Sequence, residues 1–146
     1  MRRLLAISAA GIALLATQSA AATIRPQYGM SRVVLGMTKS QVRARLGSPI
    51  GTGNGRFYYA RVWVGFRLGH AADITTTRSS ERTASGVGVD SSESAMQHAY
   101  PSVVCAPFGG FRRCRLGTGE PGTRATDFLV GHGGHVLQVT IQLVAR

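Results

Sequence analysis

Apolar and polar residues alternate along two stretches of the chain, residues 62–68 and 135–144, as in a strand with one buried face. In the longer stretch the apolar positions are Leu137, Val139, Ile141 and Leu143, and Gln138, Thr140 and Gln142 lie between them. β-Branched and aromatic residues predict four further strands, at residues 57–59, 74–77, 111–116 and 126–130. Glycine- and histidine-containing pairs between these stretches predict tight turns.

A short helix is predicted at residues 38–46. The hydroxyl of Thr38 can cap the first turn, and Gln41 can return a hydrogen bond to the backbone of Thr38, which together form a capping box. Gly47 ends the helix and Pro49 prevents it from resuming.

A weaker copy of this helix is predicted at residues 90–100, where two possible caps leave the first residue open. Met96 and Tyr100 stand in this copy where Val42 and Leu46 stand in the first helix. Three predicted strands follow each helix. The pattern therefore predicts an α+β fold of two tandem repeats, each a short helix packed on a roughly three-stranded antiparallel sheet.

The N-terminus has the three parts of a secretory signal peptide. Arg2 and Arg3 precede an apolar run that ends in small residues, and the predicted cut lies after Ala21 or Ala22. The alternative is an uncleaved anchor, but the run is shorter than the roughly 20 residues that span a bilayer. We therefore predict a secreted, bacterial protein without stable membrane insertion, with segments at residues 1–22 (signal peptide), 23–80 (first repeat) and 81–146 (second repeat).

The chain is strongly basic, with 17 Lys and Arg against 6 Asp and Glu and a formal net charge of +11. Such a charge attracts anionic partners. Export makes nucleic acid an unsuitable partner, so an acidic protein or an anionic wall polymer is expected, or the charge serves solubility alone.

Cys105 and Cys114 are the two cysteines of the chain. An even number of cysteines in an exported protein predicts a disulfide, and the glycine- and proline-rich segment between them can turn.

The first helix and its flanks resemble the signature of the SmpA/OmlA (BamE-like) domain. The matching residues are Leu35-Gly36-Met37-Thr38, Gln41-Val42 and Leu46-Gly47-Ser48-Pro49, and an aromatic strand follows them. Two copies in an exported chain resemble the β-lactamase inhibitory protein family. The resemblance implies a binding module that presents a sheet and loops to other proteins, and not an enzyme. The chain departs from the BamE-like lipoproteins in having no cysteine at the predicted cut.

Two groups of residues are candidate binding sites. The first is Trp63 between Arg61 and Arg67, a combination typical of binding surfaces; alternatively a helix covers this face and the arginines extend to water. The second group surrounds Cys114 and consists of Arg112, Arg113 and Arg115. Its alternative is a solvated strand edge on which charge discourages aggregation.

The sequence offers little for catalysis or metal binding. His132 and His135 have the spacing of metal ligands, but zinc needs three or four ligands, and Asp127 lies on the preceding strand. No G-x-S-x-G nucleophile motif occurs, and acidic pairs are scarce. We therefore predict no catalytic residues, no metal and no cofactor. The predicted function is a secreted, non-enzymatic binding module for a protein partner, with an inhibitor of a secreted hydrolase or a binder of anionic wall polymers as alternatives.

Overall fold

The structure is a computed structural model that describes residues 22–145. Within this range the chain forms eleven strands and two short helices. No helix in the described range is long and apolar enough to cross a membrane. Apart from Ala22, the predicted signal peptide lies outside the described residues.

Helix α1 (Lys39–Leu46) begins and ends where its capping residues predict. The backbone N–H of Gln41 donates to Thr38 Oγ1 at 3.2 Å, and the N–H of Thr38 donates to Gln41 Oε1 at 2.9 Å. Gly47 follows the helix with a φ of 83°, a conformation that costs glycine little. Val42 is the fully buried residue of this helix. Local hydrogen bonding thus sets its length, and one side chain anchors it to the core.

Helix α2 (Glu93–Ala99) is capped by Ser92, whose hydroxyl accepts a 3.1 Å hydrogen bond from the backbone three residues further on. Met96 is its buried residue. The ring of Tyr100, just after the helix, stacks on Phe128 with 6.1 Å between the centroids. Met96 is therefore buried in the core, and Tyr100 packs against it.

The strands form two antiparallel sheets. The first, the small sheet, consists of β1 (Ile24–Arg25), β2 (Gly29–Met30) and β3 (Val33–Val34). The second, the main sheet, has eight strands in the order β4-β5-β6-β7-β11-β10-β9-β8. Its strands are β4 (Gly51–Gly53), β5 (Arg56–Tyr59), β6 (Val62–Arg67), β7 (His70–Thr76), β8 (Val104–Phe108), β9 (Phe111–Leu116), β10 (Arg124–Val130) and β11 (Val136–Leu143).

The predicted fold class, α+β with two tandem helix-on-sheet repeats, is wrong. The chain is mostly β, and the strands expected to form two sheets form one continuous sheet. The joint is the pairing of β7 with β11, in which Ile74 lies opposite Ile141. Two separate sheets would leave the backbone groups of both strands at open edges, whereas one sheet pairs them. The strands of the small sheet and β4 have too few residues to show a periodic pattern, and β8 contains Pro107 and no alternation of apolar and polar residues.

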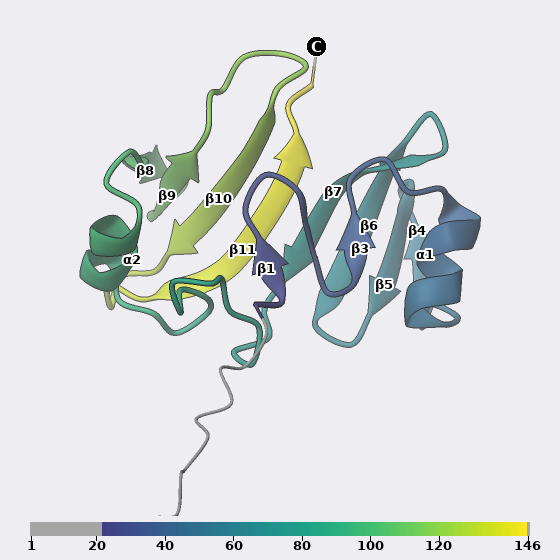
Figure 1. The fold of residues 1–146 in the computed structure, drawn as a ribbon, viewed down its shortest axis with the longest axis horizontal. Coiled ribbons are helices and arrows are strands. Elements are labelled where there is room, and N and C mark those ends of the chain that lie inside the picture. Colours follow the sequence, from purple (N-terminus) through teal and green to yellow (C-terminus); the bar gives the residue numbers. More distant parts are fainter. Residues whose placement is uncertain (1–21, 146) are drawn as a thin grey trace, which may run out of the picture.

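The core lies between one face of the main sheet and a layer made of the small sheet, α1 and α2 (Figure 1). Its fully buried larger side chains come from all of these parts: Ile24, Met30, Val33, Val42, Val62, Val64, Ile74, Met96, Phe128, Val130, Val136 and Ile141. Among the described residues, no helix covers the other face of the main sheet.

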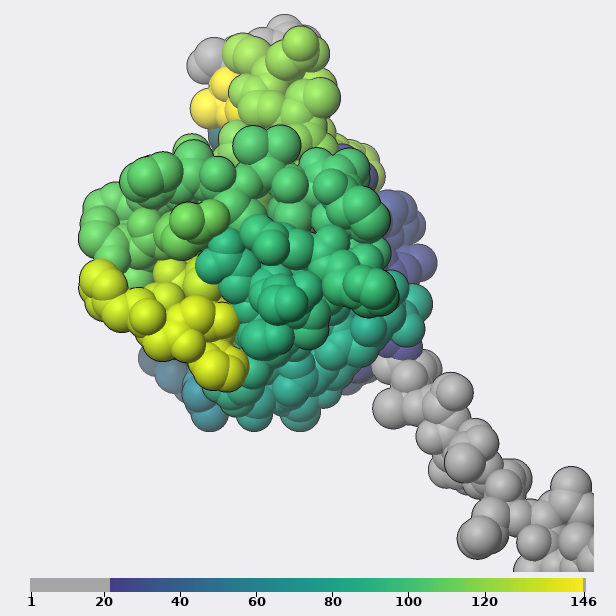
Figure 2. All heavy atoms as spheres, turned by 90° about the vertical axis from the view of Figure 1, so that its left-hand side faces the viewer, coloured from purple at the N-terminus to yellow at the C-terminus, as the bar shows by residue number. Residues whose placement is uncertain are grey.

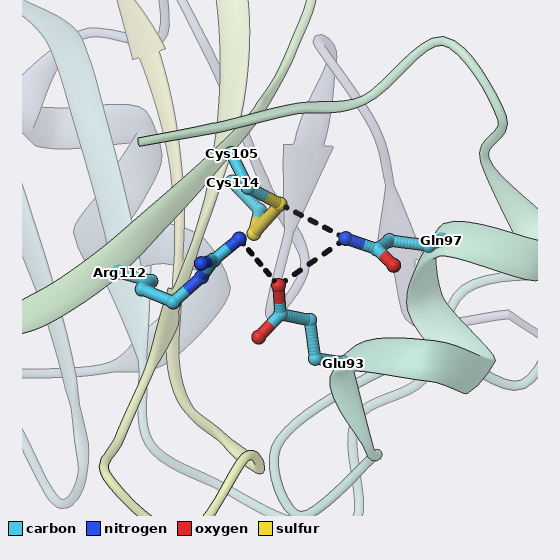
Figure 3. The surroundings of a disulfide bond; sticks show 5 residues. All are labelled: Glu93, Gln97, Cys105, Arg112 and Cys114. Atoms are coloured by element: carbon cyan, nitrogen blue, oxygen red, sulfur yellow. Dashed lines mark hydrogen bonds and ion pairs between the residues drawn. A yellow bond between two sulfur atoms is a disulfide. The ribbon is translucent and has the colours of Figure 1, made fainter. Parts of the chain in front are cut away.

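Cys105 on β8 and Cys114 on β9 form a disulfide, as predicted. The two residues lie directly opposite each other in the sheet. Cys114 is fully buried, and Gln97 of α2 contacts Cys105 Sγ at 3.5 Å (Figure 3). The disulfide therefore attaches edge strand β8 next to helix α2.

Candidate functional site

The face of the main sheet that points away from the helices, called here the open face, carries a polar row across several strands. Directly opposed residues of antiparallel strands point to the same face. The strand register therefore places on the open face, from β5 to β9, Tyr58, Trp63, Thr75, Thr140, Asp127 and Arg115. Figure 2, which views the molecule from the α2 end, shows the purple residues of the small sheet at one side and the green residues around α2 and β8 facing the viewer.

A shallow groove of about 200 Å³ lies on this face where β5, β6, β7 and β11 run side by side. We call it the Trp63 groove. The side chains that give it its chemistry are Arg56, Trp63, Arg67, Asp73, Gln138 and Gln142. The groove offers one large aromatic ring, hydrogen-bond donors from its arginine and amide groups, and acceptors from its aspartate and amide groups.

Asp73 and Arg56 form an ion pair across a strand that separates them. Gly65 of β6 lies between them, opposite Arg56 on one side and Asp73 on the other. Because glycine has no side chain, Arg56 Nη2 reaches Asp73 Oδ1 at 3.3 Å over the intervening strand. Burial raises the pKa of Asp73 above its ordinary value, and the charges of Arg56 and Arg67 oppose that rise.

The neighbouring hydroxyl groups are linked to each other. Thr75 Oγ1 lies 3.0 Å from Thr140 Oγ1, and Gln138 Nε2 donates to Thr140 Oγ1 at 3.2 Å. Thr75 is only 2% exposed, although it belongs to the open face. The floor of the groove is therefore ordered by its own hydrogen bonds before any partner binds.

Beside the groove, Asp127 is bound by residues of both neighbouring strands. Arg115 Nε and Nη2 donate to the two carboxylate oxygens at 2.7 and 2.6 Å, and Gln142 Nε2 donates to Oδ2 at 2.6 Å. This two-point hydrogen bond raises the pKa of Arg115. The cluster ties β9, β10 and β11 together, so the charge of Arg115 is already paired.

The structure places two of the three residues of the first predicted patch in one groove. Trp63 and Arg67 both line the Trp63 groove, and Arg67 Nη2 lies 3.4 Å from the carbonyl oxygen of Leu143. Arg61 is in the turn before β6, with a φ of 61°, and does not line the groove. Both helices of the described residues cover the opposite face, so neither of them covers Trp63.

The second predicted patch is divided between the two faces of the sheet, because successive residues of a strand point to opposite faces. Arg112 points to the helix side, where its Nη2 lies 2.9 Å from Glu93 Oε1 (Figure 3). Arg113 and Arg115 belong to the open face. The guanidinium group of Arg113 lies 4.5 Å from the centroid of the Phe108 ring. The three arginines therefore do not form one basic cluster.

The ion pair of Arg56 with Asp73 across Gly65 was not predicted from the sequence. Asp73 is a single acid within an otherwise apolar and β-branched strand, and that signal could have marked it as pointing to a polar face. Its pairing with Arg56 depends on the register of three strands. The strand pattern of β11 did indicate a polar face for Gln138, Thr140 and Gln142.

Within residues 22–145 the one group with metal-type spacing is Glu93 with Cys105 and Cys114, and its two sulfurs are joined in the disulfide. His132 and His135 are not part of it. His135 Nδ1 lies 2.9 Å from the carbonyl oxygen of Gly133, and the ring of His132 lies 5.9 Å from that of Phe111. Each histidine thus has a local contact within the chain.

No protein-family model and no curated protein sequence matches the chain. Two solved structures are similar. One is an extracellular protein containing a SCP domain from Bacillus anthracis str. Ames, with a TM-score of 0.53 and 8% identity; the match covers 74% of this chain and 43% of that one. The other is the DUF4309 family protein YjgB from Bacillus subtilis subsp. subtilis str. 168, with a TM-score of 0.49 and 17% identity, covering 73% of this chain and 78% of that one.

This chain thus spans less than half the length of the SCP-domain protein. At 8% identity that likeness concerns the fold alone.

Proposed function

We propose that this chain is an exported, non-enzymatic binding module whose open face docks a protein partner. The observation that carries the proposal is the Trp63 groove, in which an aromatic ring stands beside Arg67 and the Arg56–Asp73 pair on an uncovered sheet. Tryptophan and arginine are the residue types that contribute most to binding energy at protein interfaces.

The shape of the groove favours a protein partner over a small molecule. Small-ligand pockets usually enclose roughly 300–1,000 Å³, whereas the Trp63 groove has about 200 Å³. A shallow surface of this kind buries little of a small ligand. It suits a loop or a sheet edge of another protein, which can cover the groove and the rest of the polar row at once.

The hydrogen bonds beneath the groove reduce the entropic cost of binding. The linked hydroxyls of Thr75 and Thr140, and the amide of Gln138, already have partners within the chain. Side chains that are ordered before association lose less conformational freedom when a partner arrives. The open face therefore acts as a rigid template in which Trp63 and Arg67 make the direct contacts.

The compartment proposed for this module is outside the cytoplasm. The predicted signal peptide supports export, and the Cys105–Cys114 disulfide is of the kind that persists in an oxidising environment. The partner would accordingly be an extracellular or cell-envelope protein.

The experiment is affinity capture with residues 23–146, oxidised, from secreted and envelope fractions of the source cells. Bound proteins are washed at roughly 1 M salt, where screening reduces the range of charge attraction to about 3 Å. The partner is identified, purified and titrated against three forms of the module: wild type, Trp63→Ala and Arg61→Ala. Arg61 is the matched control because it is exposed and lies outside the groove.

We expect Trp63→Ala to weaken binding by about 30-fold or more, which corresponds to the roughly 2 kcal/mol of an interface hot spot. Arg61→Ala should change the affinity less than about threefold. Equal losses in both variants, or full binding by Trp63→Ala, would show that the partner docks elsewhere.

A further inference from the structure

A second and larger hollow lies on the helix side of the molecule, with a volume of about 990 Å³. It is bounded by the small sheet, the end of α1 and the segment at residues 78–81. Four arginines line it, and we call it the arginine groove: Arg25, Arg32, Arg45 and Arg78.

These arginines come from four separate parts of the chain. Arg25 ends β1, Arg32 lies in the turn between β2 and β3 with a φ of 67°, and Arg45 is in the last turn of α1. Arg78 follows β7. No local pattern in the sequence connects them, and the packing of the small sheet beside α1 brings them together.

The groove has an excess of positive charge. Within residues 22–145, Arg25, Arg32 and Arg45 form no ion pair with an acidic side chain. Arg78 is held in place, because its Nε and Nη2 donate to the carbonyl oxygen of Ala60 at 3.0 and 2.8 Å. The open face differs, since Arg56 and Arg115 each pair with an aspartate there.

The one acidic residue among those that line the groove is Glu81, which is 6% exposed. Its Oε1 accepts a 2.6 Å hydrogen bond from the hydroxyl of Ser31 and lies 3.9 Å from Arg78 Nη1. Its Oε2 is buried and has no hydrogen-bond partner among the described residues. A buried carboxylate oxygen usually has a donor, and a ligand hydroxyl that reaches the floor would supply one.

An aromatic ring completes the site. Tyr28 lines the groove, is 42% exposed, and has the guanidinium group of Arg25 at 4.0 Å from its ring centroid. Its exposed part offers a flat apolar surface next to positive charge. The groove thus combines guanidinium groups, an aromatic surface and a hydrogen-bond acceptor.

We propose that the arginine groove binds an acidic glycan, a chain of sugars that carries carboxylate or phosphate groups. Guanidinium groups bind both anions through paired hydrogen bonds. The sugar ring has an apolar face for Tyr28 and hydroxyl donors for Glu81. An acidic peptide would satisfy the arginines but brings few hydroxyl groups to the floor.

This site is on the opposite side of the main sheet from the Trp63 groove. The module can therefore hold a glycan on its helix side while its open face remains free for a protein. The two sites are independent, and each can fail without the other.

The experiment is calorimetric titration of oxidised residues 23–146 with three probes: a tetrameric uronic acid oligosaccharide, a sugar-phosphate oligomer of equal charge, and a glutamate peptide of equal charge. The test variant is Arg32→Gln with Arg45→Gln. The matched control is Arg61→Gln with Arg124→Gln, two exposed arginines outside the groove, which leaves the same net charge. Circular dichroism verifies that all variants are folded.

We expect at least one glycan probe to bind, and the better one identifies its acidic group as carboxylate or phosphate. The Arg32/Arg45 variant should lose about tenfold or more in affinity, the control less than about twofold, and Trp63→Ala should bind the glycan as wild type does. Three results would overturn the proposal: no binding of either glycan, equal losses in both double variants, or a glutamate peptide that binds as tightly as the glycans.

Discussion

The carboxylate of Asp73 lies against Gly65 on the neighbouring strand, in space that the β-carbon of any other residue would occupy. Gly65 is buried within β6, where the register with β7 shifts between Gly65 and Phe66, and its φ is not positive, so a left-handed backbone is not the reason for a glycine there. Its missing side chain leaves room for the ion pair between Asp73 and Arg56. A methyl group at this position would displace the Asp73 carboxylate, which lines the Trp63 groove together with Arg56.

Gly65→Ala should therefore destabilise the protein by about 1–3 kcal/mol, the usual cost of an added group in a filled space. Asp73 would have to rotate away from Arg56. Urea unfolding measures the change. Gly53→Ala is the matched control, since nothing lies within 4 Å of a β-carbon built on that strand glycine. It should stay within about 0.5 kcal/mol of wild type, and a similar effect of both substitutions would contradict the steric account.

Asp73 should make stability fall as the pH rises from the acid side. Burial raises its pKa in the folded state above the ordinary value of 3.8. The folded protein then binds this proton more readily than the unfolded chain, so the stabilisation is complete below the unfolded pKa. It is lost as the pH rises through the folded pKa.

Asp73→Asn should remove this contribution, so its free energy of unfolding should decrease less than that of wild type as the pH rises above 3.8. Thermal unfolding at a series of pH values gives the comparison. Glu120→Gln, in the exposed loop between β9 and β10, controls for the loss of one negative charge. Parallel profiles for wild type and Asp73→Asn would show that burial of Asp73 has no effect on its protonation.

Asp127→Ala should lower the free energy of unfolding by about 3 kcal/mol or more, because it leaves the largely buried Arg115 guanidinium without its acceptor. The side chains of this pair are 20% and 10% exposed. Glu93→Ala breaks the more exposed pair with Arg112 and should cost less than about 1 kcal/mol. Urea unfolding of both variants measures the two changes in the free energy of unfolding. Equal changes would mean that burial does not distinguish the two ion pairs.

Replacing both cysteines by alanine should lower the free energy of unfolding by about 2–3 kcal/mol on the loop-entropy estimate. The disulfide joins residues separated by 9 positions. Because β8 is an edge strand that pairs only with β9 within the main sheet, its amide protons should exchange faster in the variant than in wild type, whereas those of β10, inside the sheet, should change less. Unchanged exchange in β8 would show that backbone pairing alone holds this edge.

Local signals in the sequence located the elements well. The capping box of Thr38 and Gln41 and the glycine after Leu46 define α1, because every interaction that sets its ends lies within a few residues. Periodicity and composition located five strands to within two residues at each end: β5, β6, β9, β10 and β11. The strand predicted at residues 74–77 covers only the last part of β7, which begins at His70, a residue expected in the turn. The pairing of Cys105 with Cys114 followed from there being two cysteines in the chain.

The candidate site could be predicted only in part. Trp63 and Arg67 lie four residues, or two strand periods, apart on the same strand, and the structure places both in the Trp63 groove. Arg61 lies two residues, or one strand period, before Trp63 but is in a turn, where the strand period no longer applies. Arg112, Arg113 and Arg115 are close in sequence and yet divided between two faces of β9.

By itself, the sequence of this protein determined helix α1, most of six strands, the pairing of its two cysteines and the apolar side of β6 and β11, because these follow from residues close together in the chain. Only the tertiary structure decided that β7 pairs with β11 to make one sheet and that Gly65 makes room for Asp73. It also decided that four distant arginines line one groove. Those contacts join residues far apart in the chain, and the free energy of packing and strand pairing that selects them leaves no periodic trace in the sequence.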